Sequence, residues 1–166
     1  MERVFVGIGS NLGDAQSQVE SAISQINRAS ELEVIRSASL YGSKPFGPVE
    51  QDDFVNTVIE IACSLEPLEL LNTLKEIERT MGRAHGVRWG PREIDLDILL
   101  FGSREYSSDD LNLPHAGIAE RAFVLVPLAE LEPELVLADG LTIGEAISRL
   151  EKGLVWPLQR ATTINL

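Results

Sequence analysis

The order of strand-like and helix-like segments limits this chain to a small set of folds. Runs rich in β-branched and aromatic residues predict strands, whereas apolar residues spaced three and four apart predict amphipathic helices. The predicted strands are Arg3–Gly9, Glu33–Tyr41, Phe54–Ala62 and Ile94–Phe101. One helix follows the candidate N-cap Asp14, and another begins near Pro67 and ends at Gly82. The order β-α-β-β-α-β predicts an α+β sandwich with helices on an antiparallel-rich sheet.

The segment after the last of these strands has a helical pattern. Ile118–Leu131 has helical spacing, although Pro127 is expected to bend or restart the helix. Thr142 and Glu145 match the capping box that opens a last short helix. We therefore expect a helical C-terminal extension.

Length and composition are those of one globular domain. The chain has 166 residues, 44% of them hydrophobic, so we expect a single domain over residues 1–166. The single cysteine, Cys63, lies in an apolar run, and we interpret it as a buried thiol. We find no signal-peptide pattern and no apolar stretch of membrane-spanning length. These features predict a cytoplasmic protein without a membrane partner.

One cationic window interrupts an otherwise acidic sequence. The formal net charge of −12 argues against nucleic acid as the main partner. Residues 79–92 nevertheless contain four arginines and no acidic residue, namely Arg79, Arg83, Arg88 and Arg92. Such a window favours a small anionic ligand. A solvated surface loop is the alternative.

The strand after this window carries two carboxylates. Alternation along a strand puts Asp95 and Asp97 on one face, opposite Ile94, Leu96 and Ile98. Carboxylates about 7 Å apart repel each other unless a cation lies near them. Mg²⁺ is held by one or two carboxylates together with substrate phosphates. The pair therefore indicates a magnesium site for phosphoryl transfer, with an acidic solvent-exposed face as the alternative.

The familiar nucleotide-binding motifs are absent. The sequence has no P-loop pattern, and the turn over residues 7–13 has Leu12 where a dinucleotide fingerprint needs its third glycine. We interpret it as a tight turn that lets backbone approach a flat ligand. Phe54 and Asn56 share a predicted strand face and could bind a planar heterocycle. The residues by themselves favour the alternative, in which Phe54 and Phe123 are core residues and Asn56 is an edge residue.

Several segments resemble the 6-hydroxymethyl-7,8-dihydropterin pyrophosphokinase family. Residues 88–102, from Arg88 to Gly102, resemble its signature, and residues 9–13 resemble its opening turn. Residues 45–48 and 54–56 resemble its pterin-side segments, and residues 113–115 with Arg121 and Phe123 resemble its distal segment. The resemblance runs in order from Val4 to about Leu135.

This resemblance implies a fold and a reaction. The fold would be ferredoxin-like, and the β,γ-diphosphate of ATP would pass to the pterin alcohol with release of AMP. Two Mg²⁺ ions would be held by Asp95 and Asp97, while Arg83 and Arg92 would act on the transferred phosphates. The partners would be ATP and 6-hydroxymethyl-7,8-dihydropterin, and the chain is expected to be a monomer.

The resemblance also implies two sets of binding residues. The pterin contacts would be Gly9, Ser43, Phe46, Phe54, Asn56 and Phe123. The ATP contacts would be Lys75, Glu78, Trp89, Ile98, Asn112, His115 and Arg121. Ala116, Asp110 and His85 depart from residues that occur in the family, which leaves details of ATP affinity open.

Two other functional classes compete with this hypothesis. A ligand-binding regulatory domain could share the scaffold, but it would not need the carboxylates Asp95 and Asp97 beside an arginine-rich loop. An RNA-binding module is disfavoured by the net charge of −12 and by the lack of an aromatic RNA-binding run. The enzyme hypothesis accounts for more of the sequence than either alternative.

Overall fold

The computed structural model describes residues 1–45, 47–48, 50–82 and 94–158. The main sheet contains β1 (Glu2–Ser10), β2 (Leu32–Ser37), β3 (Tyr41–Ser43), β4 (Phe54–Cys63), β5 (Asp95–Phe101) and β8 (Val155–Pro157). A separate small sheet contains β6 (Tyr106–Ser107) and β7 (Asn112–Leu113). The helices are α1 (Ala15–Arg28), α2 (Pro67–Thr80), α3 (Ala122–Leu131) and α4 (Ile143–Ser148), and the 3₁₀ turn η1 spans Ile118–Glu120.

The main sheet is antiparallel at every pairing. Its strand order is β5-β1-β4-β3-β8, and β2 also pairs with β4. β2 and β3 lie one after the other along the same edge of β4, because β2 pairs with residues 59–63 and β3 with residues 54–56. The first strand of the chain is therefore central, between β4 and β5.

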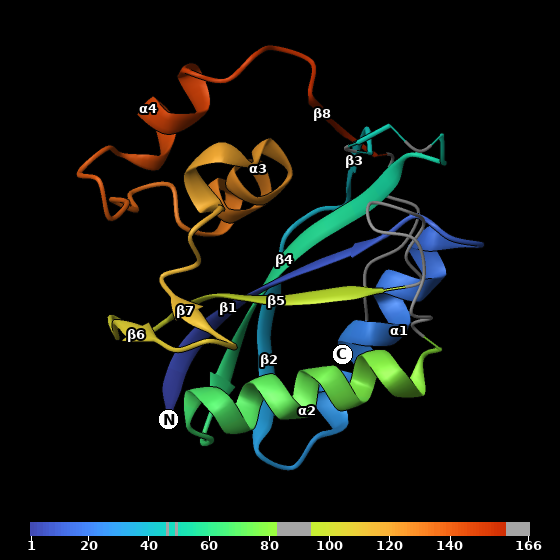
Figure 1. Cartoon of the computed structure of the whole chain (residues 1–166), viewed down its shortest axis with the longest axis vertical. Coiled ribbons are helices and arrows are strands. Elements are labelled where there is room, and N and C mark those ends of the chain that lie inside the picture. The colour runs from blue at the N-terminus through green and yellow to red at the C-terminus, as the bar shows by residue number, and fades with distance from the viewer. Residues whose placement is uncertain (46, 49, 83–93, 159–166) are drawn as a thin grey trace.

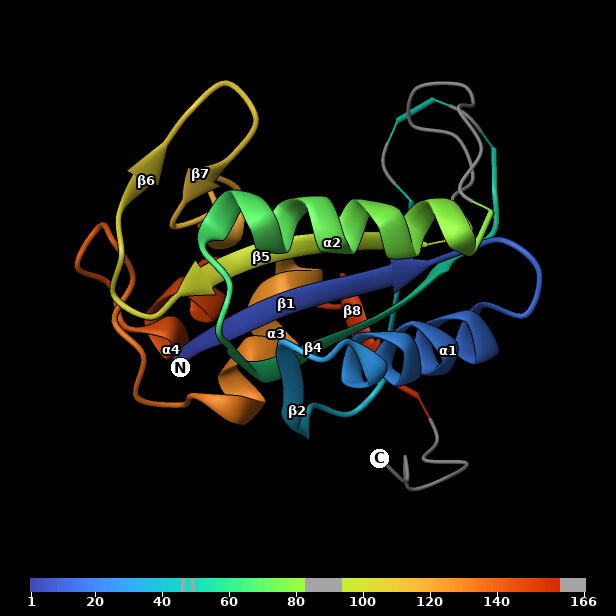
Figure 2. The ribbon, with the colours of Figure 1, turned by 90° about the horizontal axis from the view of Figure 1, so that it is seen from below.

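The two faces of this sheet are covered by different helices. Alternate residues of β1, Val4, Val6 and Ile8, pack in a core with α1 and α2. The other face carries a second core in which Phe5, Val58 and Leu99 pack against α3 and α4. Figure 1 shows α1 and α2 below the sheet and α3 and α4 above it, and Figure 2 views the sheet from the side of α1 and α2.

The ends of the first two helices have the chemistry that the sequence predicted. The Asp14 carboxylate accepts a hydrogen bond from the Ser17 backbone N–H at 3.1 Å, which pairs one of the free donors of the first turn of α1. Pro67 is the first residue of α2, where its missing N–H costs nothing. Gly82 has a φ of 85° just beyond the C-cap of α2, a conformation that suits glycine.

Three sequence predictions need correction. The strand predicted over Glu33–Tyr41 is interrupted after Ser37, and β3 extends to Ser43, beyond the predicted end. The helix predicted over Ile118–Leu131 is divided at Arg121 into η1 and α3, and α3 continues through Pro127. The short strands β6, β7 and β8 were not predicted at all.

The remaining expectation for the core is confirmed at Cys63. This thiol is 1% exposed at the end of β4, and burial raises its pKa above the ordinary value. Within the described ranges, every helix falls short of the length and apolar character that a membrane span needs.

Candidate active site

The candidate site begins with a row of residues across one end of the sheet. Gly9 of β1 lies opposite Asp95 of β5 on one side and opposite Asn56 of β4 on the other. Tyr41 of β3 continues the row opposite Asn56. Directly opposed residues point to the same face. Because neighbouring strands are about 4.8 Å apart, Asp95 and Asn56 are separated by about 10 Å across Gly9.

The two predicted metal ligands share the face that α3 covers further along the sheet. Asp95 is partly exposed and Asp97 is exposed, whereas Leu96 between them is 4% exposed in the opposite core. Asp97 lies opposite Gly7, so neither carboxylate faces a β1 side chain. The predicted alternation of Asp and apolar residues along β5 is confirmed.

The donor set suits a cation that also binds substrate oxygens. Among the residues described, no group of three or more His, Cys, Asp or Glu side chains could by itself hold a metal ion. Two carboxylates on one face are instead the usual protein share of a Mg²⁺ site, in which phosphates and water complete the coordination. Asp95 and Asp97 therefore fit Mg²⁺ delivered with a polyphosphate.

A second cluster lies on β1, β3 and β4, next to the carboxylates. The Asn56 carboxamide is 4% exposed, and its Nδ2 donates to the Ser43 Oγ at 2.7 Å. A Cβ on Gly9 would lie 3.0 Å from Asn56 Oδ1 and 3.8 Å from the Phe54 ring. Gly9 therefore makes room for the carboxamide. The structure brings together four of the predicted pterin contacts, Gly9, Ser43, Phe54 and Asn56.

The start of α3 supplies the aromatic residue predicted for the pterin's other side. The guanidinium of Arg121 lies 5.9 Å from the centroid of the Phe123 ring, within the range of a cation–π contact. Phe123 is half-buried and packs against the second core. A Cβ on Gly117 would lie 2.8 Å from Arg121 Nε, so the guanidinium crosses close to this glycine. Stacking of a ligand between Phe54 and Phe123 stays a prediction.

His115 lies near both Asp97 and Arg121. Its backbone N–H donates to the Leu99 carbonyl at 2.9 Å, which holds the residue at the edge of β5. Burial lowers the pKa of His115 below its ordinary 6.5, the nearby Asp97 opposes this shift, and Arg121 adds to it. The Gly117 N–H donates to Nδ1 at 3.0 Å, so a neutral imidazole carries its proton on Nε2. His115 is therefore suited to donate a hydrogen bond from Nε2.

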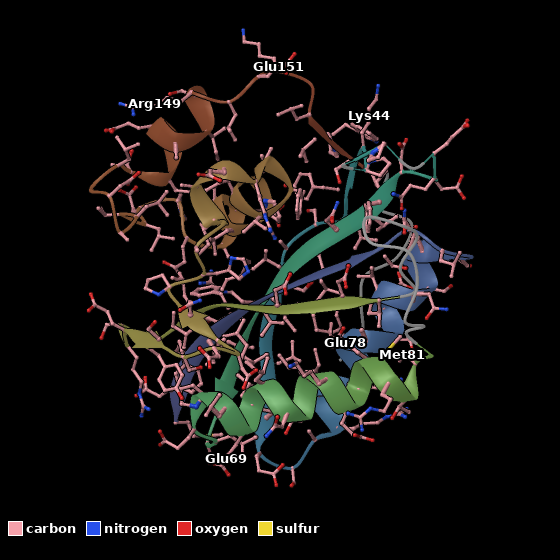
Figure 3. The ribbon with its side chains drawn as sticks, viewed as in Figure 1. Lys44, Glu69, Glu78, Met81, Arg149 and Glu151 are labelled. Carbon is pink, nitrogen blue, oxygen red and sulfur yellow. The ribbon has the colours of Figure 1, made fainter. Side chains whose placement is uncertain are left out.

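Three other predicted nucleotide contacts lie on the α1 and α2 side of the sheet. Glu78 is 4% exposed on the side of α2 that faces the sheet, whereas Glu69 points away from it (Figure 3). Lys75 is exposed on α2. The Ile98 side chain is 2% exposed in the core under α1 and α2, so it cannot reach a ligand on the Asp97 face. A nucleotide contact by Ile98 would have to come from its backbone.

Asn112 is the last of these predicted contacts within the described residues. It is exposed on β7, and its Oδ1 accepts a hydrogen bond from the Ser107 hydroxyl at 3.0 Å. This bond joins the two strands of the small sheet beside β5. The remaining predicted site residues, Phe46, Arg83, Trp89 and Arg92, lie outside the described residues.

Two side chains that support the site were not singled out from the sequence. Asn11 is 3% exposed, and its Nδ2 donates to Gln51 Oε1 at 2.7 Å and to the Asp52 carbonyl at 2.9 Å. It thus ties the end of β1 to the segment before Phe54. Glu130 of α3 accepts from the Tyr41 hydroxyl at 2.6 Å and from the Ser39 N–H at 2.8 Å. Both contacts join residues far apart in sequence, so local patterns carried no signal for them.

Comparison with known families identifies the chemistry. Residues 5–133 match the family model described as 7,8-dihydro-6-hydroxymethylpterin-pyrophosphokinase. The chain belongs to this pyrophosphokinase family. It is an enzyme of folate biosynthesis that transfers a pyrophosphoryl group to a hydroxymethyldihydropterin, with ATP as co-substrate. The resemblance seen in the sequence is confirmed.

Individual relatives agree with this assignment to the pyrophosphokinase family. A 2-amino-4-hydroxy-6-hydroxymethyldihydropteridine pyrophosphokinase of Pseudomonas aeruginosa is 43% identical over 148 residues, 89% of this chain and 91% of the relative. A protein of the same name from Methylorubrum extorquens is 39% identical over 151 residues, 91% of this chain and 95% of the relative.

A solved structure is similar to this pyrophosphokinase in its fold alone. The wild-type HPPK-DHPS of Plasmodium falciparum has a TM-score of 0.67 at 15% identity, over 89% of this chain. The chain spans 44% of that longer protein. The likeness covers the mixed arrangement of helices on an antiparallel sheet.

Proposed function

We propose that this pyrophosphokinase transfers the β,γ-pyrophosphoryl group of ATP to the hydroxymethyl oxygen of 6-hydroxymethyl-7,8-dihydropterin. The alcohol oxygen forms a bond to the β-phosphorus, the bond from that phosphorus to the α,β-bridging oxygen breaks, AMP leaves with that oxygen, and the alcohol proton is released. The observation that carries the proposal is the row Asp95, Gly9 and Asn56 across neighbouring strands. In this row Asp95 lies about 10 Å across the sheet from the buried Asn56, with only Gly9 between them, which supports a metal side and a pterin side next to each other.

The metal side of the proposal uses Asp95 and Asp97 for two Mg²⁺ ions. Two carboxylates on one strand face, both reachable from solvent to some degree, support this role. When bound, Mg²⁺ neutralises charge on the phosphate oxygens. The carboxylates would fix where the polyphosphate lies relative to the pterin alcohol. Arg83 and Arg92 would stabilise charge on the transferred phosphates, a role that rests on the resemblance around residues 88–102.

The pterin side uses the cluster around Asn56. A carboxamide has two N–H donors and an acceptor oxygen, so after its bond to Ser43 it keeps groups that can pair with the edge of a heterocycle. The 4% exposure of Asn56 strengthens such hydrogen bonds because little water competes for them. Phe54 and Phe123 would lie on the two ring faces, and Gly9 and Phe46 would complete the pocket.

The nucleotide side uses the segment that runs along the edge of β5. His115 would donate from Nε2 to a phosphate oxygen, and Arg121 would add positive charge beside it. Further ATP contacts would come from Lys75, Glu78, Trp89, Asn112 and the backbone of Ile98, which rest on the resemblance. Trp89 would cover the site and exclude water from the transferred group.

We also propose a specific fold arrangement, domain organisation and oligomeric state for this enzyme. The strand order β5-β1-β4-β2, with α1 and α2 on one face, supports a ferredoxin-like arrangement, and α3 and α4 would form its helical C-terminal extension. We propose a single domain over residues 1–166 that acts as a cytoplasmic monomer. The net charge of −12 disfavours nucleic acid and anionic membrane surfaces as partners.

The test of this function is the identity of the nucleotide product. The protein is incubated with Mg²⁺, the pterin alcohol and ATP labelled at its β-phosphorus. Transfer of the pyrophosphoryl group yields AMP and moves the label to the pterin, whereas a simple kinase would yield ADP that keeps the label. Asp109→Asn, a change at an exposed position of the β6–β7 turn, is the matched control for Asp97→Asn. Formation of ADP, or full activity of Asp97→Asn, would contradict the proposal.

A further inference from the structure

The chain's last strand in the structure adds a second partner to β3. β8 pairs antiparallel with β3, with Trp156 opposite Gly42, Val155 opposite Ser43 and Pro157 opposite Tyr41. Beyond the strand, the Leu158 N–H donates to the Leu40 carbonyl at 3.0 Å. The family model covers residues 5–133, so β8 lies beyond the matched segment. A strand from outside that segment therefore pairs with one that carries a proposed pterin contact.

The Trp156 ring packs so closely on Gly42 that residue 42 has to be glycine. A Cβ on Gly42 would lie 2.2 Å from Nε1, 2.5 Å from Cε2 and 3.0 Å from Cζ2 of Trp156. Gly42 has no positive φ, so the backbone conformation does not demand glycine at this position. The close approach of the indole is the physical reason for glycine at residue 42.

Trp156 and the proposed pterin contacts lie on opposite faces of the sheet. Gly42 is opposite both Trp156 and Val55, so these three residues share one face. Tyr41 and Ser43 point to the other face, where Asn56 donates to the Ser43 hydroxyl at 2.7 Å. Trp156 therefore packs on the face of β3 opposite to the one where Ser43 meets the Asn56 carboxamide. It cannot contact a ligand at Asn56, but it can fix the position and orientation of β3.

β3 needs such support because it is short. It has three residues, and its pairing with β4 is limited to Phe54–Asn56. A two-stranded pairing of this length is weak in water. Glu130 of α3 fastens Tyr41 and Ser39 from the pterin face, and Trp156 packs on Gly42 from the other face. The strand is thus held between α3 and the indole.

We propose that Trp156 is a positioning residue for the pterin side of the site. It holds β3 through Gly42, so that the Ser43 hydroxyl stays at hydrogen-bond distance from Asn56 and keeps the carboxamide oriented toward the substrate. Because this inference rests on the proposed pterin contacts, it predicts an effect on pterin binding without an effect on ATP. Interactions that pre-orient a binding group act by lowering the entropic cost of binding.

The test is a double-mutant cycle between Gly42 and Trp156, measured by steady-state kinetics with either substrate varied. Trp156→Ala is expected to raise the pterin KM about tenfold and to leave the ATP KM within about twofold. Gly42→Ala should do the same, because its Cβ displaces the indole. In the Trp156→Ala background Gly42→Ala should add less than about twofold, since the ring it would meet is gone. Trp156→Phe, which keeps an aromatic ring, should be intermediate.

Controls separate positioning from general loss of structure. Leu154→Ala alters a residue that is 41% exposed in the same tail and should change neither KM. Thermal unfolding of the four proteins of the cycle should show the same non-additivity. A pterin KM unchanged in Trp156→Ala, an equal rise in both KM values, or full additivity with Gly42→Ala would each overturn the inference.

Phe54→Ala, measured in parallel, shows whether the positioning role of Trp156 or the proposed function itself is wrong. If Phe54→Ala raises the pterin KM and Trp156→Ala does not, the positioning role is wrong and the proposed pterin side stands. If the wild-type protein forms no AMP, the proposed function is wrong and the positioning role falls with it. The unfolding cycle then reports only on the packing of Trp156 against Gly42.

Discussion

Replacing Asp97 by asparagine should stabilise the free protein slightly and remove its response to magnesium and nucleotide. Asp95 and Asp97 point to the same face of β5, two residues apart, which separates the carboxylates by about 7 Å. Because Asp97 is exposed, a dielectric constant near that of water applies, and the repulsion is about 0.6 kcal/mol. Screening at 0.1 M salt lowers it to about 0.3 kcal/mol.

These magnitudes predict a small gain in thermal stability. For a domain of this size 1 kcal/mol corresponds to about 2–4 °C in Tm, so Asp97→Asn should unfold about 1–2 °C above wild type in EDTA at low salt, and about 1 °C above it at 0.1 M salt. The gain should vanish in 1 M salt, where the screening length of about 3 Å is shorter than the separation of the charges. Asp109→Asn changes the net charge equally at an exposed position outside the proposed site and is the control for the ligand response.

Ligand binding should reverse the order of stability. A ligand present at 100 times its Kd stabilises the folded state by about 2.7 kcal/mol, which corresponds to about 5–11 °C. Wild type and Asp109→Asn should show this increase with Mg²⁺ and a non-hydrolysable ATP analogue, whereas Asp97→Asn should show little of it. Calorimetry of the three proteins with and without ligand provides the measurement. A lower Tm for Asp97→Asn in EDTA, or an equal ligand response, would refute the reasoning.

Three further predictions test the rest of the site and the ion pairs that support the fold. Phe54→Ala should weaken pterin binding by about 1–3 kcal/mol through lost stacking and burial, with ATP binding unchanged, as calorimetric titration would show. The Asn56→Ala and Ser43→Ala changes should be coupled by about 1 kcal/mol in urea unfolding, because Asn56 Nδ2 donates to the Ser43 Oγ at 2.7 Å; full additivity would exclude that bond. Arg36→Ala should lower the free energy of unfolding by about 2 kcal/mol, since its guanidinium, although the side chain is 40% exposed, pairs with the 8%-exposed Glu60 and donates to the Leu131 carbonyl at 2.7 Å. Arg3→Ala, whose side chain is 59% exposed and meets Glu60 at 3.4 Å, should cost at most about 1 kcal/mol, and equal costs for the two arginines would contradict this difference.

The sequence was informative where a pattern extends over many residues. The alternation in β5 places Asp95 and Asp97 opposite Leu96 because a strand has a period of two, and the structure has the same arrangement. Gly82 has the positive φ expected beyond the end of α2. Such features depend on neighbours in the chain, so they can be read without knowledge of the fold.

Features that depend on distant partners could not be read in this way. β8 has three residues and no detectable periodicity, and its partner β3 lies more than 100 positions earlier. The close contact of Trp156 with Gly42 therefore left no local pattern in the sequence. Ile98 was predicted as an ATP contact from a motif, but a motif does not say whether the side chain or the backbone of a residue faces the ligand. The Ile98 side chain is 2% exposed in the core.

The break in the predicted second strand has a similar origin. Glu33–Tyr41 is rich enough in strand-forming residues to suggest one strand, but the structure divides the edge of β4 between β2 and β3. Between β2 and β3, the Ala38 backbone N–H donates to the Val58 carbonyl at 2.9 Å. The Thr57 hydroxyl lies within 3.1 Å of the Ala38 and Ser39 carbonyls and can donate to either. The break in the strand thus depends on contacts with β4, which the local sequence of residues 33–41 does not show.

The central position of β1 has a consequence for synthesis on the ribosome. This strand is made before both of its partners, β4, completed at Cys63, and β5, completed at Phe101. At about 5–20 residues per second, its second edge remains without a partner for on the order of 5–20 s after it is translated. During that time its apolar side chains are exposed and its backbone can pair with other nascent chains. The yield of native protein should therefore depend on translation rate and on chaperones that bind extended apolar segments.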